Sequence, residues 1–544
     1  MGEKKRRLAA AAAGVKTTRG DDRQAWALAA RAQALTAQSA FEPALHDLAQ
    51  ALELAPHLDP LWAQFGELVR FFGFVHPLHP RLRAQLERAL GHPAVDPGNL
   101  VRPITSAALS RPPGEAFAEP LLLRLLEDAV VRDARLEALL ASERRRALEG
   151  AALPLEVLIA LAHQCFNTEY VLDETSAESA AVAELRVKPA HDADYALYAA
   201  YRPLHTLPDA ARVAEQLAQT PLASLARRQL LEPLEEQRLR TGIASLGAPT
   251  GAVSAAVRAQ YEENPYPRWL RMQTSFDAAP LADIVRELFP DIPVKRGPAR
   301  ILVAGCGTGQ NTIGTARRFA GSSVLAVDLS LASLAYAKRK TIELGVSNIV
   351  YRHADLLALG SLGERFQLVE ASGVLHHMED PLAGWRVLAG LVERGGFMRI
   401  GLYSERGRRH FVHARQFIAA HGFDATPPGI RAARAAIRAA AAEDELLARV
   451  ARNEDFFSLS GCRDMLFHVQ EKRLTLPGIA ALLEALGLQF LGFEFADSGI
   501  TAARYRQRFA ADAAMRDLDN WHRYEEDNPD CFARMYQFWA RKPG

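Results

Sequence analysis

The stretch ILVAGCGTG, residues Ile301–Gly309, decides the fold of this chain. An apolar run ends there in a Gly-x-Gly-x-Gly turn, and a helical pattern begins near Gln310. Gly305, Gly307 and Gly309 let the backbone turn tightly and approach a ligand with no Cβ in the way. The stretch therefore predicts a strand, a ligand-binding loop and a helix in succession.

Further apolar, β-branched runs follow this stretch, and helical patterns separate them. Strands that alternate with helices imply right-handed βαβ crossovers and a parallel, doubly wound sheet. We therefore assign the α/β fold class, with a Rossmann-like domain at residues 255–405. Together with the first run, the expected strands are residues 300–305, 323–328, 348–351, 366–371 and 396–402.

Carboxylates follow the second and third expected strands. Asp328 lies 23 residues after Gly305, the spacing at which a carboxylate can bond ribose hydroxyls across the switch point of the sheet. Asp355 follows the third strand, where it can accept a hydrogen bond from an adenine amino group. A dinucleotide dehydrogenase prefers Gly-x-Gly-x-x-Gly, whereas here the third glycine comes one residue early at Gly309.

In these motifs, residues 300–405 resemble class I S-adenosylmethionine (AdoMet) dependent methyltransferases. The resemblance implies AdoMet as cofactor, the glycine turn as its loop, Asp328 as the ribose-binding acid and Asp355 as the adenine contact. Val303 departs from the family, which often carries an acid there, so one contact to the methionine end of AdoMet is unaccounted for. The cofactor-binding residues that we expect are Gly305, Cys306, Gly307, Thr308, Gly309, Gln310, Asp328, Leu329, Asp355, Leu356 and Glu370.

Three tyrosines are the candidate catalytic residues. Tyr261 and Tyr266 belong to YEENPYPRW, residues 261–269, a proline-stiffened aromatic segment just before the domain. Such a segment is either a rigid packing plug or a substrate lid, since aromatic faces and phenolic oxygens suit both a sulfonium and an amine. Tyr403 follows the fifth strand, where doubly wound folds place ligand contacts.

A metal site is not expected. His376 and His377 are adjacent, so their side chains point in different directions, and acids at metal-ligand spacing are missing nearby. We expect the two histidines to wall the cofactor pocket instead. The four cysteines, Cys165, Cys306, Cys462 and Cys531, match neither a disulfide framework nor a zinc site, which favours the cytoplasm.

Composition excludes other classes of partner. Lys and Arg total 65 against 64 Asp and Glu, so no whole-chain field would draw the protein onto nucleic acid. The chain also lacks the run of ~18 consecutive apolar residues that a membrane span needs, so we expect no membrane insertion. A homodimer is left open.

Regions outside residues 255–405 are expected to form four further parts. Residues 1–20 predict a disordered basic tail, 21–246 a helical region, 406–475 a helical middle region and 476–544 an α+β region that closes with a helix ending in Met535–Trp539. Between Ala44 and Trp62 the spacing of small residues, large residues and proline is typical of a tetratricopeptide (TPR) helix pair, or of an ordinary helical hairpin.

Several segments across the chain resemble bacterial protein-lysine methyltransferases of the large type that modifies a rickettsial outer membrane protein. The resemblance implies a protein substrate with lysine as acceptor, which the helical region 21–246 would select. A small-molecule acceptor and a non-catalytic AdoMet-binding protein remain the alternatives. The segments are Gln164–Tyr170, Tyr261–Trp269, the glycine loop, Asp455–Asp464, Phe467–Gln470 and Met535–Trp539.

Overall fold

The computed structural model describes residues 20–112, 114–187, 191–247, 251–273, 278–495 and 499–544. The predicted tail at residues 1–20 lies outside this part except for its last residue. By its internal contacts the chain divides into two compact units: residues 1–233 with 269–275, and residues 234–268 with 276–544. None of the helices in the described part is both long enough and apolar enough to cross a membrane.

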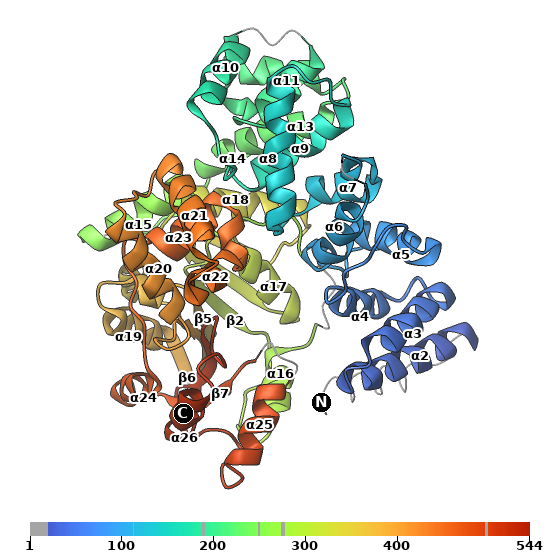
Figure 1. Ribbon diagram of the computed structural model, residues 1–544. Coiled ribbons are helices and arrows are strands. Elements are labelled where there is room, and N and C mark those ends of the chain that lie inside the picture. Colours follow the sequence, from blue (N-terminus) through green and yellow to red (C-terminus); the bar gives the residue numbers. More distant parts are fainter. Residues whose placement is uncertain (1–19, 113, 188–190, 248–250, 274–277, 496–498) are drawn as a thin grey trace. The chain divides into compact units, whose positions relative to one another are not determined.

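The first unit is helical throughout its described residues (Figure 1). Its helices bury one leucine- and alanine-rich face each; α7, for example, buries Leu121, Leu122, Leu125 and Leu126, which share one side of a 3.6-residue turn. The α-helices are α2 (Gly20–Ala37), α3 (Phe41–Leu54), α4 (Asp59–Val69), α5 (Pro80–Gly91), α6 (Val101–Leu109), α7 (Pro120–Asp128), α8 (Ala134–Leu148), α9 (Leu155–Asn167), α10 (Ser176–Val187), α11 (Asp192–Ala199), α12 (Ala210–Leu217) and α13 (Ala223–Ala226).

The expected helix pair is present as α3 and α4. Ala44, Leu48 and Ala51 are fully buried, and the indole N–H of Trp62 donates to the carbonyl oxygen of Pro56 at 2.8 Å. This bond anchors α4 to the turn before it. A helical hairpin therefore forms here, and its membership of a TPR array stays a prediction.

The second unit is built on an eight-stranded sheet with the order β1-β4-β3-β2-β5-β6-β8-β7. The strands from β1 to β6 pair in parallel, and β8 pairs antiparallel with both β6 and β7. The predicted α/β class and all five predicted strands are confirmed. The strands are β1 (Ala244–Ser245), β2 (Arg300–Ala304), β3 (Ser323–Asp328), β4 (Ile349–His353), β5 (Phe366–Ser372), β6 (Val392–Leu402), β7 (Gln489–Phe493) and β8 (Tyr536–Arg541).

Helices cover both faces of this sheet, as a doubly wound fold requires. Residues of β2, β3, β5, β6, β7 and β8 divide between two separate apolar cores, one on each face of the sheet. The first core contains residues of α16 (Leu281–Leu288), α17 (Gln310–Arg318) and α18 (Leu331–Glu343). The second contains residues of α19 (Pro381–Leu391), α24 (Leu476–Ala485) and α26 (Leu518–Asp527). The remaining α-helices are α14 (Glu232–Arg240), α15 (Ala252–Glu263), α20 (Arg409–Ala420), α21 (Pro427–Ala440), α22 (Glu445–Ala451), α23 (Leu459–Phe467) and α25 (Ile500–Arg508).

The C-terminal segment corrects one expectation. Residues 535–539 were expected to end a helix, but Tyr536–Arg541 is strand β8, hydrogen bonded between β6 and β7. Tyr536, Phe538, Trp539 and Ala540 are all fully buried, because both faces of the sheet are covered here. In a short, mostly apolar run, the sequence shows no regular alternation of apolar and polar residues. Periodicity therefore cannot distinguish a strand from a buried helix.

Candidate functional site

The glycine loop turns at the carboxyl end of β2, as its sequence predicts. The backbone N–H groups of Gly305 and Cys306 both donate to the carbonyl oxygen of Val327 on β3, at 2.9 and 3.0 Å. Gly309 has φ +85°, and a Cβ placed on it would lie 2.6 Å from the Cβ of Ala337 on α18. Only glycine lets α17 start this close to α18.

Asp328 joins this loop to the end of β3. Its carboxylate accepts the N–H of Gly307 at 2.7 Å through Oδ2 and the N–H of Ser330 at 2.9 Å through Oδ1. Burial raises the pKa of Asp328, and the two backbone bonds partly offset that shift. The side chain is half-buried, and each oxygen keeps a second lone pair that a hydroxyl donor can use.

The other predicted cofactor residues lie at or near these strand ends. Asp355 is buried after β4, where its Oδ1 accepts the N–H of Leu357 at 3.0 Å and begins the short helix Leu356–Ser361. The carbonyl oxygen of Leu329 bonds His353 Nε2 at 2.9 Å.

Glu370 is held in a different set of contacts. Glu370 on β5 is the register partner of Val303 on β2. Val303 is the position at which methyltransferases of this class often carry an acid, so Glu370 places a carboxylate beside it on the neighbouring strand. Its carboxylate accepts from Thr315 at 2.6 Å and Asn311 at 3.4 Å, both on α17, and pairs with Arg399 at 3.4 Å. None of these partners belongs to residues 305–310, and a cofactor contact by Glu370 stays a prediction.

The aromatic segment 261–269 lies against the glycine loop through its backbone. A Cβ on Gly307 would come within 2.8 Å of the Tyr266 carbonyl oxygen, and the hydroxyl of Thr308 donates to the Pro267 carbonyl oxygen at 2.5 Å. A second tie runs from the hydroxyl of Ser330 to the Tyr261 carbonyl oxygen at 3.0 Å. The loop and the segment therefore form one continuous structure.

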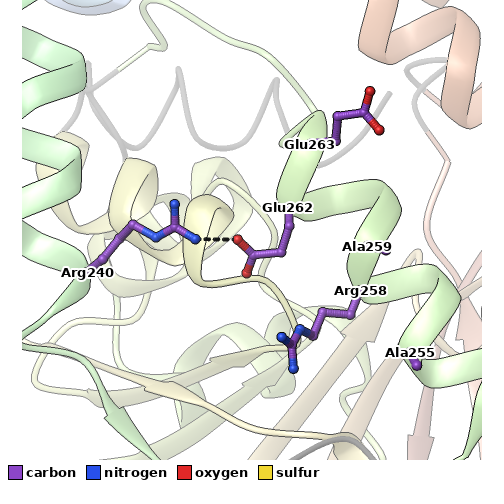
Figure 2. Close-up of a pocket in the computed structure, with 6 residues that line it drawn as sticks. All are labelled: Arg240, Ala255, Arg258, Ala259, Glu262 and Glu263. Atoms are coloured by element: carbon purple, nitrogen blue, oxygen red, sulfur yellow. Dashed lines mark hydrogen bonds and ion pairs between the residues drawn. The ribbon is translucent and has the colours of Figure 1, made fainter. Parts of the chain in front are cut away.

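Helix α15 presents Glu262 beside this structure. One carboxylate oxygen of Glu262 accepts the N–H of Leu331 at 2.5 Å, and the other accepts from Arg240 at 2.5 Å. Figure 2 shows the Arg240–Glu262 pair at the edge of a hollow of about 640 Å³. None of the predicted site residues lines this hollow, whose walls are Arg240, Ala255, Arg258, Ala259, Glu262 and Glu263.

Comparison with known families agrees with this geometry. A family profile described as "Methyltransferase domain" matches residues 301–396, the span from β2 into β6. The chain carries a class I AdoMet-dependent methyltransferase domain. AdoMet is the cofactor of this domain.

Similar proteins cover only parts of the chain. An uncharacterised protein of Synechococcus is 28% identical over 307 residues, which are 52% of this chain and 70% of that protein. A ubiquinone biosynthesis O-methyltransferase of Alkalilimnicola ehrlichii is 37% identical over 98 residues, or 18% of this chain and 38% of that enzyme. The structure of PKMT2 from Rickettsia typhi aligns with a TM-score of 0.38 and 16% identity, covering 47% of this chain and 51% of the other. The chain thus spans about half or less of the length of the last two relatives.

The three candidate tyrosines of the methyltransferase unit come together, and carboxylates from the middle region meet two of them. The Tyr261 hydroxyl donates to Asp464 Oδ1 at 2.6 Å, and the Tyr266 hydroxyl donates to Asp455 Oδ1 at 3.1 Å. Burial raises the pKa of both tyrosine hydroxyls well above the usual value, and the neighbouring carboxylates add to the shift. We name this group the acceptor cluster; its members are Tyr261, Tyr266, Tyr403, Asp455, Asp464, His376, His377 and His468.

Tyr403 lies between the ring of His376 and the guanidinium of Arg408. The ring of His376 stacks on it with centroids 3.7 Å apart, and the guanidinium carbon of Arg408 lies 3.7 Å from the same centroid. Two groups at that distance occupy opposite ring faces, so Tyr403 is enclosed between them. Within the described residues its hydroxyl has no hydrogen-bond partner, and burial raises its pKa.

The histidines of the acceptor cluster form a hydrogen-bond network. His377 Nδ1 donates to the Gln470 carbonyl oxygen at 2.7 Å, while His468 Nδ1 accepts the Gln470 N–H at 3.0 Å. Burial lowers the pKa of both rings, so each is neutral at pH 7 and His468 carries its hydrogen on Nε2. That nitrogen lies 3.1 Å from the Tyr261 hydroxyl oxygen and donates to it.

The same three side chains, His377, Asp464 and His468, bring potential metal-ligand atoms within 4.8 Å of one another. A metal would need the lone pair of His468 Nε2, which holds a hydrogen in this network. The two imidazole rings also stack with centroids 3.7 Å apart and an interplanar angle of 17°, so their lone pairs lie in two separate, nearly parallel planes and cannot both point at one ion. The arrangement fits hydrogen bonding better than metal coordination.

Sequence reasoning did not assign roles to Asp455, Asp464 or His468. Their segments, 455–464 and 467–470, carried a family resemblance but no recognisable spacing to the tyrosines. The structure joins Tyr261 to Asp464 across 203 residues. Resemblance was thus the only signal in the sequence that marked these residues.

Proposed function

We propose that this chain transfers the methyl group of AdoMet to a lysine side chain of a protein. The observation that carries the proposal is the position of the acceptor cluster: segment 261–269 contacts the cofactor loop through its backbone and bears Tyr261 and Tyr266 on the same few residues. Methyl transfer from a sulfonium is an in-line displacement, for which the protein supplies alignment and a partly dry site. No protein nucleophile is required.

In this proposal the cofactor rests on the glycine loop. Residues 305–310 would approach the methionine end, Asp328 the ribose hydroxyls and Asp355 the adenine amino group, with Leu329 and Leu356 beside them. The free lone pairs of Asp328 support the ribose assignment. The helical region 21–246 would select the protein partner, since helical arrays present extended surfaces for polypeptide.

A small-molecule acceptor is the second candidate, and the similarity to ubiquinone biosynthesis O-methyltransferases favours it. A phenolic oxygen becomes a good nucleophile only when it loses its proton, which requires a base. Asp464 of the acceptor cluster is buried, and in the described residues no salt bridge joins it to a basic side chain, so a cationic ammonium suits the cluster better than a neutral phenol. This feature supports the amine proposal over the phenol alternative.

Transfer of label from AdoMet tests the proposal. The purified chain and AdoMet with a tritiated methyl group are incubated with an extract of the source organism, and protein, nucleic acid and small metabolites are separated. We expect label in protein, recovered as N-methyl-lysine after acid hydrolysis. Label confined to the metabolite fraction would favour the small-molecule acceptor and overturn the protein proposal.

A further inference from the structure

The helical middle region supplies the carboxylates of the acceptor cluster, and their contacts define what the cluster can bind. We propose that Asp464 is a positioning residue that fixes the direction of the Tyr261 hydroxyl hydrogen. The phenolic oxygen is then free to accept a hydrogen bond from the group that receives the methyl. Asp455 does the same for Tyr266. The site is thereby specific for an amine that arrives as a cation. This inference rests on the proposed methyl transfer and adds the residues that set its acceptor class.

The direction of the Tyr261 hydroxyl follows from its two partners. A carboxylate can only accept, so the hydroxyl hydrogen points to Asp464, 2.6 Å away. The neutral ring of His468 donates its Nε2–H to the same tyrosine oxygen at 3.1 Å. One lone pair of that oxygen remains, and it can receive only a donor such as an N–H group.

Asp464 is a buried carboxylate that lacks an ion-pair partner among the described residues. Its side chain is 4% exposed, and in the described residues no salt bridge joins it to a basic side chain. Arg408 and Arg415 are near enough to act on it electrostatically, but both bind Glu471, at 2.7 Å each. A buried carboxylate without a paired cation is costly, and a bound ammonium would offset that cost.

Unfilled hydrogen-bonding groups also belong to the acceptor cluster. His376 is fully buried, and neither of its ring nitrogens has a hydrogen-bond partner in the described part of the chain. The His376 ring stacks on the Tyr403 ring with centroids 3.7 Å apart, and its centroid lies 4.3 Å from that of the His377 ring. Buried polar groups are rarely left without partners unless a ligand or water completes them. An amine supplies several N–H donors to such a site, and a hydroxyl supplies one.

The proton balance of the step is complete with these residues. An ammonium N–H gives its proton to the Tyr261 oxygen while the tyrosine hydrogen moves to Asp464. The free amine then forms the N–C bond to the methyl carbon as the C–S bond breaks, and sulfur keeps the electron pair. The products are a methylated ammonium and a neutral thioether, and Asp464 returns its proton to solvent.

Sinefungin tests the inference without any protein acceptor, because this AdoMet analogue carries an ammonium where AdoMet carries its S-methyl sulfonium. Calorimetry on the full-length protein compares its affinity with that of S-adenosylhomocysteine, which lacks the cation. We expect the wild-type chain to prefer sinefungin by about tenfold or more, the effect of one charge-assisted hydrogen bond. Asp464→Asn keeps the volume, removes the charge and should abolish most of this preference, with little change for S-adenosylhomocysteine.

A matched variant and a double substitution complete the experiment. Asp444→Asn changes another aspartate of the middle region, which caps α22 and bonds His413. Asparagine also caps helices, so this control should keep the full preference. If Asp464 acts through Tyr261, then Tyr261→Phe alone should lose the preference, and adding Asp464→Asn should change it no further.

The outcomes separate this inference from the proposed function. Equal preference in wild type and Asp464→Asn, or additive losses in the double variant, would overturn the positioning role. Failure of label to enter protein, with the sinefungin preference intact, would overturn the protein substrate and leave the amine site standing. If Asp464→Asn does not fold, Tyr261→Phe decides alone, since a wild-type preference for sinefungin in that variant contradicts the inference.

Discussion

The two sides of the proposed methyltransferase site are built in different ways. The predicted cofactor side consists of short contiguous pieces at the ends of β2, β3 and β4, namely residues 305–310, Asp328 and Asp355. The acceptor cluster is assembled from segments far apart in the chain, with separations of 203 residues for one tyrosine–carboxylate bond and 189 for the other. A tight backbone turn requires particular residue types and therefore leaves a pattern in the sequence. A contact between side chains far apart in the chain leaves no such pattern.

If the cofactor side depends on backbone geometry, its glycines should be the most sensitive positions. Gly309→Ala places a Cβ 2.6 Å from Ala337 at φ +85°. We expect it to lower the free energy of unfolding by about 2–5 kcal/mol, combining left-handed strain with overpacking. Urea denaturation measures this loss through the midpoint.

Gly321 provides the control for this substitution. It has φ +71°, but a Cβ placed on it would meet no other atom within 4 Å. Gly321→Ala should therefore cost only the backbone strain, about 1–2 kcal/mol. Equal losses in the two variants would show that contact with α18 does not restrict the loop.

The sequence was sufficient for most of the sheet because its strands are regular apolar runs between helices. Its weakest prediction was at β8, where Tyr536–Trp539 lies in the middle of the antiparallel part and all of its residues except Gln537 are fully buried. Strand β1 was also missed, since Ala244–Ser245 is only two residues long and pairs through its backbone with β4. Both depend on neighbours that the local sequence does not specify.

For the site, the turn of the glycine loop was predictable because a tight turn needs glycine, and the place of Asp328 at the end of β3 followed from the strand pattern, while its contact with ribose stays a prediction. The three tyrosines were named from their composition and position. Their partners Asp455 and Asp464 were not, since nothing local marks a buried aspartate as a tyrosine's hydrogen-bond acceptor. The cytoplasmic location, the homodimer and the absence of a nucleic-acid partner stay predictions.

Removing hydroxyls should damage the acceptor cluster and spare the cofactor side. Tyr261→Phe and Tyr266→Phe keep the ring volume, and we expect each to lower the methylation rate by tenfold to a thousandfold, or about 1.4–4 kcal/mol of barrier. AdoMet affinity, measured by calorimetry, should change little. Tyr403→Phe tests the third member in the same assay.

A tyrosine outside the cluster shows whether such losses are specific. The Tyr505 hydroxyl donates to Asp512 at 2.6 Å, the same distance as the Tyr261–Asp464 bond. Tyr505→Phe should lower stability by about 1–3 kcal/mol and leave the rate per folded molecule near wild type. Wild-type turnover in all three cluster variants would instead make segment 261–269 a packing element.

Asp328→Ala should produce the reverse pattern, with weak cofactor binding and an intact acceptor cluster. Each charge-assisted bond to a ribose hydroxyl contributes about 1.5–3 kcal/mol, so we expect AdoMet affinity to fall at least tenfold while the rate at saturating AdoMet stays close to wild type. Asp380→Ala, which removes the cap of α19, controls for general loss of a helix-end carboxylate. Unchanged AdoMet affinity in a folded Asp328→Ala protein would reject the ribose assignment.

The smallest effect concerns Glu525, a carboxylate that binds the side chain of Ser404, the residue after Tyr403 of the acceptor cluster. It is 1% exposed and accepts from Ser404 at 2.6 Å and from Tyr536 at 2.7 and 2.8 Å. Burial raises its pKa above the usual value. Between the unfolded and folded pKa values the native state therefore binds more protons, and the contribution of Glu525 to stability falls as pH rises through that window.

Glu525→Gln cannot ionise and keeps one acceptor oxygen, so relative to wild type it should be more stable at about pH 7.5 than at about pH 4, which is below the ordinary pKa of glutamate. Urea denaturation at both pH values measures the change. Glu494 offers a control of opposite sign: burial raises its pKa, but the charge and hydrogen bonds of Arg399 and the Trp539 N–H outweigh burial and hold that pKa low. Glu494→Gln should thus lose stability relative to wild type as pH rises. Parallel pH dependences for wild type and Glu525→Gln would mean that Glu525 ionises in the folded protein without a cost in stability.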